Sequence, residues 1–246
     1  MAPTIHYSRS PLVEAVLAIQ FNASRLTLDQ LAKCGPKVKS EYPNLKAVHR
    51  GTGRIEFGEK ASASATSENV GYSWTSANEK QIFQATLDGF SFSLLAPYSS
   101  WDEFSKEAHR LWEIYRKIVR GSMEYTRVAL RYINQIDIPM LSVEMSEFFS
   151  IYPQIPTSLP QQMGPFFFHV TLPLPEAKLN VNIIQTQVPP PLGKPEHTSV
   201  ILDLDFYRSE SIPTGESFWE VFEDMAKHKN RVFEACITDK TREVIK

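Results

Sequence analysis

The sequence predicts an α+β fold made of two consecutive β-α-β-β-β-α units, residues 1–122 and 123–246. Two observations predict it. The expected strands and helices follow the same order twice along the chain. The helices that close the two halves also align at an offset of 118 residues, which places Trp101 with Trp219 and Phe104 with Phe222. A repeated element order with a matching apolar pattern indicates an internal duplication.

The first half opens with residues 11–21, where one set of alternate positions is wholly apolar, as in a strand with one buried face. A helix begins near residue 27, and Gly35-Pro36 interrupts it. Three strands are expected at 47–58, 63–76 and 81–95. The closing helix begins after Ser100, whose hydroxyl forms a capping box with Glu103, and Gly121 ends it.

The second half repeats this order. A strand at 127–139 precedes a short helix near 142–153, and three strands follow at 166–174, 178–188 and 198–207. The closing helix again opens with a predicted capping box, Ser217 and Glu220. Each sheet needs helices to cover its apolar side. We therefore expect one curved antiparallel sheet with helices on one face, as in a TATA-binding-protein-like or helix-grip saddle.

Composition excludes several classes of protein. The net charge of −2 provides no overall field for a nucleic-acid backbone or an acidic membrane surface. The start of the chain lacks the pattern of a signal peptide, and no apolar stretch is long enough to span a membrane. Cys34 and Cys236 have no partner at metal-ligand spacing, and so few cysteines favour a reducing compartment. We expect a cytoplasmic protein.

Arg131 is an unusual residue for the middle of a strand. The alternation between residues 127 and 138 places Arg131 opposite a core face that contains one polar residue, Asn134. Asn134 must therefore find hydrogen-bond partners or lie at a bulge. Strand 198–207 shows the same division. We predict a charged face that binds a ligand or a partner protein, formed by Glu14, Arg127, Arg131, Gln135, Asp203, Asp205 and Tyr207. The simpler interpretation is a solvated sheet face with routine salt bridges.

The usual catalytic and metal-binding patterns do not occur. The six histidines are scattered, and the chain has neither a glycine-rich phosphate loop nor a GxSxG motif. Cys236 lies on an apolar helical stripe, which favours a core residue over a nucleophile. Asp203 and Asp205 share a face, but no third ligand for a cation accompanies them. We predict no catalytic residues, no metal and no cofactor, and the sequence favours a protein that is not an enzyme.

Four phrases together resemble a sporadically distributed family of bacterial proteins of about this length, which has no assigned activity. They are PLVEAVLAIQF, GFSFSLLAPYSSWDEF, RVALRYINQIDIP and KNRVFEACITD. The resemblance covers nearly the whole chain. It implies a conserved full-length architecture and supplies no catalytic residues. A patchy distribution is typical of accessory genes in defence or toxin–antitoxin loci, which is an association and not a mechanism.

The first functional hypothesis is a non-enzymatic protein that neutralises or chaperones a protein partner, as an antitoxin, immunity protein or chaperone does. The partner could be encoded in the same locus, and a homo-oligomer is also compatible with the sequence. The second hypothesis is a small-ligand-binding or hydrolytic protein that uses Glu14, Arg131, Asp203 and Asp205 around a concave sheet face. The third is nucleic-acid binding by the basic residues of the second half, although interleaved carboxylates favour a solvated helix there.

Overall fold

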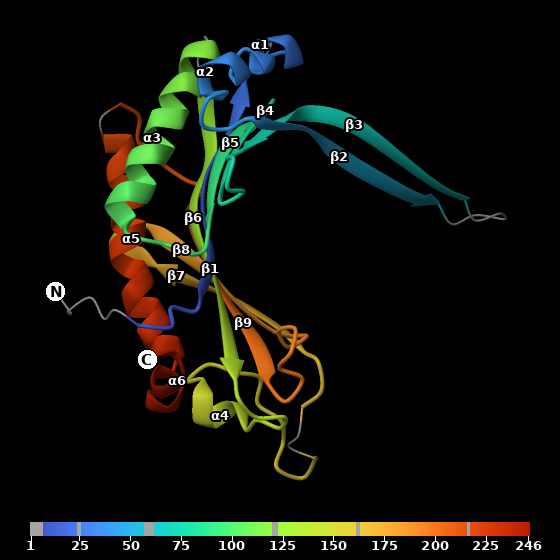
Figure 1. Cartoon of the computed structure of the whole chain (residues 1–246), viewed down its shortest axis with the longest axis vertical. Coiled ribbons are helices and arrows are strands. Elements are labelled where there is room, and N and C mark those ends of the chain that lie inside the picture. Colours follow the sequence, from blue (N-terminus) through green and yellow to red (C-terminus); the bar gives the residue numbers. More distant parts are fainter. Residues whose placement is uncertain (1–6, 24–25, 57–61, 120–122, 161–162, 216) are drawn as a thin grey trace. The chain divides into compact units, whose positions relative to one another are not determined.

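The computed structural model describes residues 7–23, 26–56, 62–119, 123–160, 163–215 and 217–246. Within them the strands form one nine-stranded antiparallel sheet with the order β2-β3-β4-β5-β1-β6-β9-β8-β7 (Figure 1). The strands are β1 (Leu12–Ala23), β2 (Asn44–Glu56), β3 (Ser62–Thr75), β4 (Gln81–Thr86), β5 (Gly89–Leu95), β6 (Met123–Ile138), β7 (Phe167–Leu174), β8 (Leu179–Val188) and β9 (Thr198–Arg208). The helices are α1 (Leu28–Ala32), α2 (Gly35–Val38), α3 (Trp101–Ile118), α4 (Met145–Phe148), η1 (Pro175–Ala177), α5 (Ser217–Cys236) and α6 (Asp239–Ile245).

The predicted fold class, α+β with two β-α-β-β-β-α units in a saddle, is wrong. The chain is mainly one large antiparallel sheet with few helices. The predicted strand 81–95 is a hairpin, because Thr86 pairs with Gly89 and leaves a two-residue loop of Leu87 and Asp88. An Asp-Gly pair between apolar alternations is a strong hairpin signal. In the second half, the described residues between β6 and β8 form the four-residue α4, strand β7 and the three-residue η1, and a separate helix α6 follows α5.

The chain divides into two compact units, which are described separately below. The larger unit contains Met1–Val16, Leu95–Ser99 and Arg127–Lys246. The smaller unit contains Leu17–Leu94 and Ser100–Thr126. Strands β1 and β6 each contribute residues to both units.

An aromatic core holds the smaller unit together. Helix α3 buries Phe104, Ala108, Leu111, Trp112 and Tyr115. The Phe104 ring stacks on Phe92 of β5 with 5.2 Å between centroids, and Trp112 meets Phe90 edge-on at 5.4 Å. Such ring pairs add stability beyond the area that they bury. Helix α3 therefore packs on the sheet through one apolar face.

Strands β2 and β3 form a long ribbon that extends away from β4 and β5 in the same unit (Figure 1). The ribbon is paired from Asn44↔Thr75 to Glu56↔Ser62, with a bulge between Val48 and His49. Residues 49–53 of β2 and 65–68 of β3 are exposed, on both faces of the ribbon. A two-stranded ribbon without a buried face has little stability of its own. Its base is anchored by Val70 and Trp74, which are buried.

The core of the larger unit lies between the sheet and α5, which packs against β9. Helix α5 buries Phe218, Val221, Phe222, Met225 and Ala226. On the same helix the ammonium of Lys229 lies 4.2 Å from the ring centroid of Tyr132 and 4.7 Å from that of Tyr98. Burial lowers the pKa of Lys229 to about 8. Lys229 is therefore a partly desolvated cation held between two aromatic rings.

The helix termini partly follow the predictions. The Ser100 hydroxyl accepts a hydrogen bond from the Glu103 amide at 3.2 Å, as expected of an N-cap. Ser217 is the first residue of α5, and its hydroxyl donates to the Thr214 carbonyl. Gly121, the predicted end of α3, lies outside the described residues.

None of the helices in the described ranges combines the length and the apolar character that crossing a bilayer requires.

Candidate functional site

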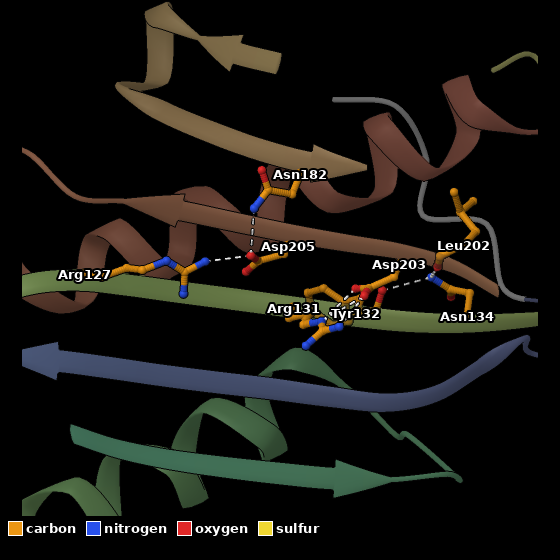
Figure 2. Close-up of polar contacts among 8 residues, drawn as sticks. All are labelled: Arg127, Arg131, Tyr132, Asn134, Asn182, Leu202, Asp203 and Asp205. Carbon is orange, nitrogen blue, oxygen red and sulfur yellow. Dashed lines mark hydrogen bonds and ion pairs between the residues drawn. The ribbon is translucent and has the colours of Figure 1, made fainter. Parts of the chain in front are cut away.

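Strand β6 in the larger unit places its core-facing side chains as the alternation predicts, whereas on β9 Ser199 and Asp203 of the opposite face are also buried. The six core-facing positions of β6, from Val128 to Ile138, are all buried. Asn134, the polar residue among them, donates from Nδ2 to the backbone oxygen of Leu202 at 3.1 Å and to that of Tyr132 at 3.3 Å (Figure 2). The buried amide is therefore paired, as a core polar group must be.

Arg131 and Asp203 form the central ion pair of the charged face (Figure 2). The Arg131 Nε donates to both carboxylate oxygens of Asp203, at 2.8 and 3.0 Å, and Nη2 donates to Oδ2. Asp203 lies in register between Ile133 of β6 and Ile184 of β8, so its neighbours across the sheet are apolar. Its side chain is 4% exposed, whereas that of Arg131 is 45% exposed. The guanidinium thus covers a buried carboxylate and faces solvent with its other side.

A second polar chain crosses four strands beside it. Thr171 of β7 donates to the Asn182 amide oxygen on β8 at 2.8 Å, and Asn182 donates to Asp205 of β9 at 3.1 Å. Arg127 of β6 donates to the same Asp205 oxygen at 2.6 Å. The Arg127 guanidinium carbon also lies 4.8 Å from the ring centroid of Tyr207. Hydrogen bonds in such a chain polarise and strengthen one another.

Glu14 and Gln135 lie differently. Glu14 is half-buried on β1, and no hydrogen bond or ion pair joins it to Arg131 within the described part of the chain. The hydrogen bond to Asp203 is the main cause that raises the pKa of Arg131, and the charge of Asp203 adds to it. The charges of Asp205 and Glu14 raise this pKa by smaller amounts. Gln135 donates to Asp137 on its own strand at 3.0 Å, and Asp137 also accepts from the Ser199 hydroxyl at 2.6 Å.

The structure therefore brings four of the seven predicted residues into two ion pairs, Arg127–Asp205 and Arg131–Asp203. Tyr207 lies against the first pair, whereas Gln135 lies nearer the C-terminal end of β6. Sequence reasoning missed Thr171 and Asn182. The alternation of asparagines at 180 and 182 on β8 was a usable signal, because strands in register with β9 share its faces.

The face offers little for covalent or metal chemistry. The described residues contain no group of three or more histidine, cysteine, aspartate or glutamate side chains that could hold a metal ion. Cys34 and Cys236 are both buried, and burial raises the pKa of each thiol to about 12. A thiol with such a pKa is a poor nucleophile at neutral pH. Asp203 and Asp205 are each engaged in an ion pair with an arginine.

We compared the chain with known proteins. A scan against protein-family models finds no match, and a search of curated proteins finds none either.

Proposed function

We propose that the chain is a non-enzymatic accessory protein that binds a protein partner on the charged face, in the manner of an antitoxin, immunity protein or chaperone. The observation that carries this proposal is the arrangement of Arg131. Its position is set by two-point pairing with a buried carboxylate, while 45% of its side chain remains exposed.

The guanidinium has five N–H donors in a rigid fork. Nε and Nη2 are engaged by Asp203, and among the described residues no hydrogen bond reaches Nη1. A partner carboxylate or backbone carbonyl can approach this free side without first ordering a flexible side chain. Arginines of this kind are frequent among the few residues that provide most of the affinity of protein interfaces.

The surroundings of Arg131 fit a protein surface with charges of both signs. Arg127 lies over the Tyr207 ring, and arginine and tyrosine are both enriched in interfaces. Arg127 and Arg131 lie among three carboxylates, those of Glu14, Asp203 and Asp205. Complementary charges of this kind determine which partner binds and in which register.

The alternative functions have less support. A hydrolytic role for Asp203 and Asp205 requires carboxylates that can exchange protons, and both are paired with arginines. Nucleic-acid binding by α5 and α6 is disfavoured because Lys227, Lys240 and Arg242 each pair with a carboxylate, so the negative charges of these helices offset much of their positive charge.

The test is capture of the partner by tagged protein expressed in its own host. The informative variant is Arg131→Gln/Asp203→Asn, which removes both charges while retaining similar shape and hydrogen bonding. The control is Arg116→Gln/Glu113→Gln, which neutralises an exposed ion pair on α3. We expect one stoichiometric protein with the wild type and the control, and at least tenfold less with the first variant. Circular dichroism should show that all three chains are folded. Equal retention by the Arg131 variant would contradict the proposal.

A further inference from the structure

A pocket of about 540 Å³ lies in the larger unit, away from the Arg131–Asp203 pair. Four segments that are distant in sequence form it. They are Arg9–Pro11, the end of β6 and the two residues after it (135–140), the loop that contains Lys194 and His197, and α6 from Lys240 to Ile245. Phe148 of α4 completes the wall. The volume is within the range of sites that hold small organic molecules.

The floor of the pocket is apolar and its rim is charged. Pro11, Ile138, Phe148 and Ile245 are buried and line the floor. Exposed Arg9, Lys194, Lys240 and Glu243 stand around the rim. A ligand that satisfies both regions has an apolar body with a charged group at one end.

The charges on the lining favour an anion. Three cations, Arg9, Lys194 and Lys240, face two carboxylates, Asp137 and Glu243, although the whole chain has a net charge of −2. Asp137 already accepts hydrogen bonds from Ser199 and Gln135, and it therefore has less capacity for a ligand cation.

Lys194 is the cation best placed to accept a new partner. Lys240 donates to Glu147 and lies 4.8 Å from the Phe148 ring centroid. The ammonium of Lys194 has no ion-pair or hydrogen-bond partner within the described ranges. Its loop is ordered by backbone hydrogen bonds from Lys194 to Pro191 and from His197 to Lys194. The His197 side chain, 14% exposed, also lines the pocket, and its Nδ1 lies 3.2 Å from Glu196 Oε1, which leaves Nε2 as the ring nitrogen available to a ligand.

We infer that this pocket binds a small organic anion, with an apolar ring or chain on the Ile138–Phe148 floor and a carboxylate or phosphate beside Lys194 and His197. A carboxylate and a phosphate share the features that the rim recognises, namely negative charge and several acceptor oxygens. Of the seven residues of the charged face, Gln135 lines this pocket, whereas neither Arg131 nor Asp203 does, so the pocket is tested separately from the Arg131–Asp203 pair.

The experiment uses three probes with one aromatic body: 1-naphthoate, 1-naphthyl phosphate and the uncharged 1-naphthamide. Isothermal titration calorimetry with the full chain measures each Kd. We expect at least one anion to bind at least tenfold more tightly than the amide. A preference between the two anions assigns the carboxylate or the phosphate as the natural group.

Two substitutions locate the binding. Lys194→Gln should weaken anion binding at least fivefold, whereas Lys106→Gln, at an exposed position on α3, should leave it unchanged. Met140→Glu places a carboxylate at the pocket from a side chain that is already 42% exposed, and it should also weaken the anion. Equal affinities for anions and amide, or anion binding that survives both pocket substitutions, would overturn the inference.

Discussion

The Arg131–Asp203 pair predicts an asymmetric response to removal of either partner. Arg131→Met leaves the Asp203 carboxylate in a site where its side chain is 4% exposed, between two isoleucines. Asp203→Leu leaves the Arg131 guanidinium, whose side chain is 45% exposed and can turn toward water. A buried charge without its partner is costly, whereas an exposed one is hydrated.

The magnitudes follow from this difference. Removing one partner of a buried ion pair lowers the free energy of unfolding by about 3 to 5 kcal/mol. Because Arg131 is partly exposed, we expect Arg131→Met near the lower end of this range, at about 3 kcal/mol. Asp203→Leu replaces the carboxylate with a side chain that can pack on Ile133 and Ile184, and should cost about 1 kcal/mol or less. The double variant should be within about 1 kcal/mol of the wild type, because it leaves no unpaired charge.

The assay is urea-induced unfolding, followed by far-ultraviolet circular dichroism and by tryptophan fluorescence. Coincidence of the two transitions justifies a free energy of unfolding for each variant. Arg127→Met is a useful comparison, because Asp205 retains the hydrogen bond from Asn182 and this variant should lose less stability than Arg131→Met. The reasoning is refuted if Asp203→Leu destabilises the chain more than Arg131→Met does.

Three further predictions concern stability. Burial lowers the pKa of Lys229 to about 8, so as the pH rises the folded chain releases this proton before the unfolded chain does. The free energy of unfolding should therefore rise by about 1 kcal/mol between about pH 7 and about pH 9, relative to that of the Lys229→Met variant. Urea unfolding at both pH values measures this difference. Gly71→Ala places a Cβ 2.2 Å from a backbone oxygen of β4, and it should lower the free energy of unfolding by about 3 kcal/mol in the same assay. A Cβ at Gly164 has no neighbouring atom within 4 Å, so Gly164→Ala should leave the stability unchanged. Tyr115→Phe removes a 2.8 Å hydrogen bond to the Thr86 carbonyl and should lower the melting temperature, by an amount that corresponds to about 1 kcal/mol.

Local patterns were sufficient for the faces of individual strands. Alternation correctly assigned the core side of β6, and with it the need for partners at Asn134. These assignments succeed because side chains on a strand alternate strictly between two faces. The fold class failed where one short signal was overlooked. Asp88-Gly89 divides residues 81–95 into two strands, and the supposed repeat then no longer has equal halves.

The candidate sites could be predicted only in part, because they depend on contacts between residues that are distant in the sequence. Arg131 could be placed on the charged face from sequence, but its pairing with Asp203, two positions along from its direct neighbour Asp205, depends on strand register. The pocket beside Lys194 joins segments near residues 9, 135, 194 and 240. No periodicity connects such distant stretches, because their proximity arises from tertiary packing alone.

The β2–β3 ribbon has a consequence for how this sequence can change during evolution. Residues 49–53 and 65–68 are exposed on both faces, so packing places almost no restriction on their identity. Substitutions there should be tolerated as long as they favour an extended backbone, and the ribbon should drift faster than β6 or β9. Arg50 is an exception, because its guanidinium pairs with Asp88 at 2.6 Å. Any other of these ribbon positions that resists change in a saturation mutagenesis screen for activity would therefore report selection by something outside the chain.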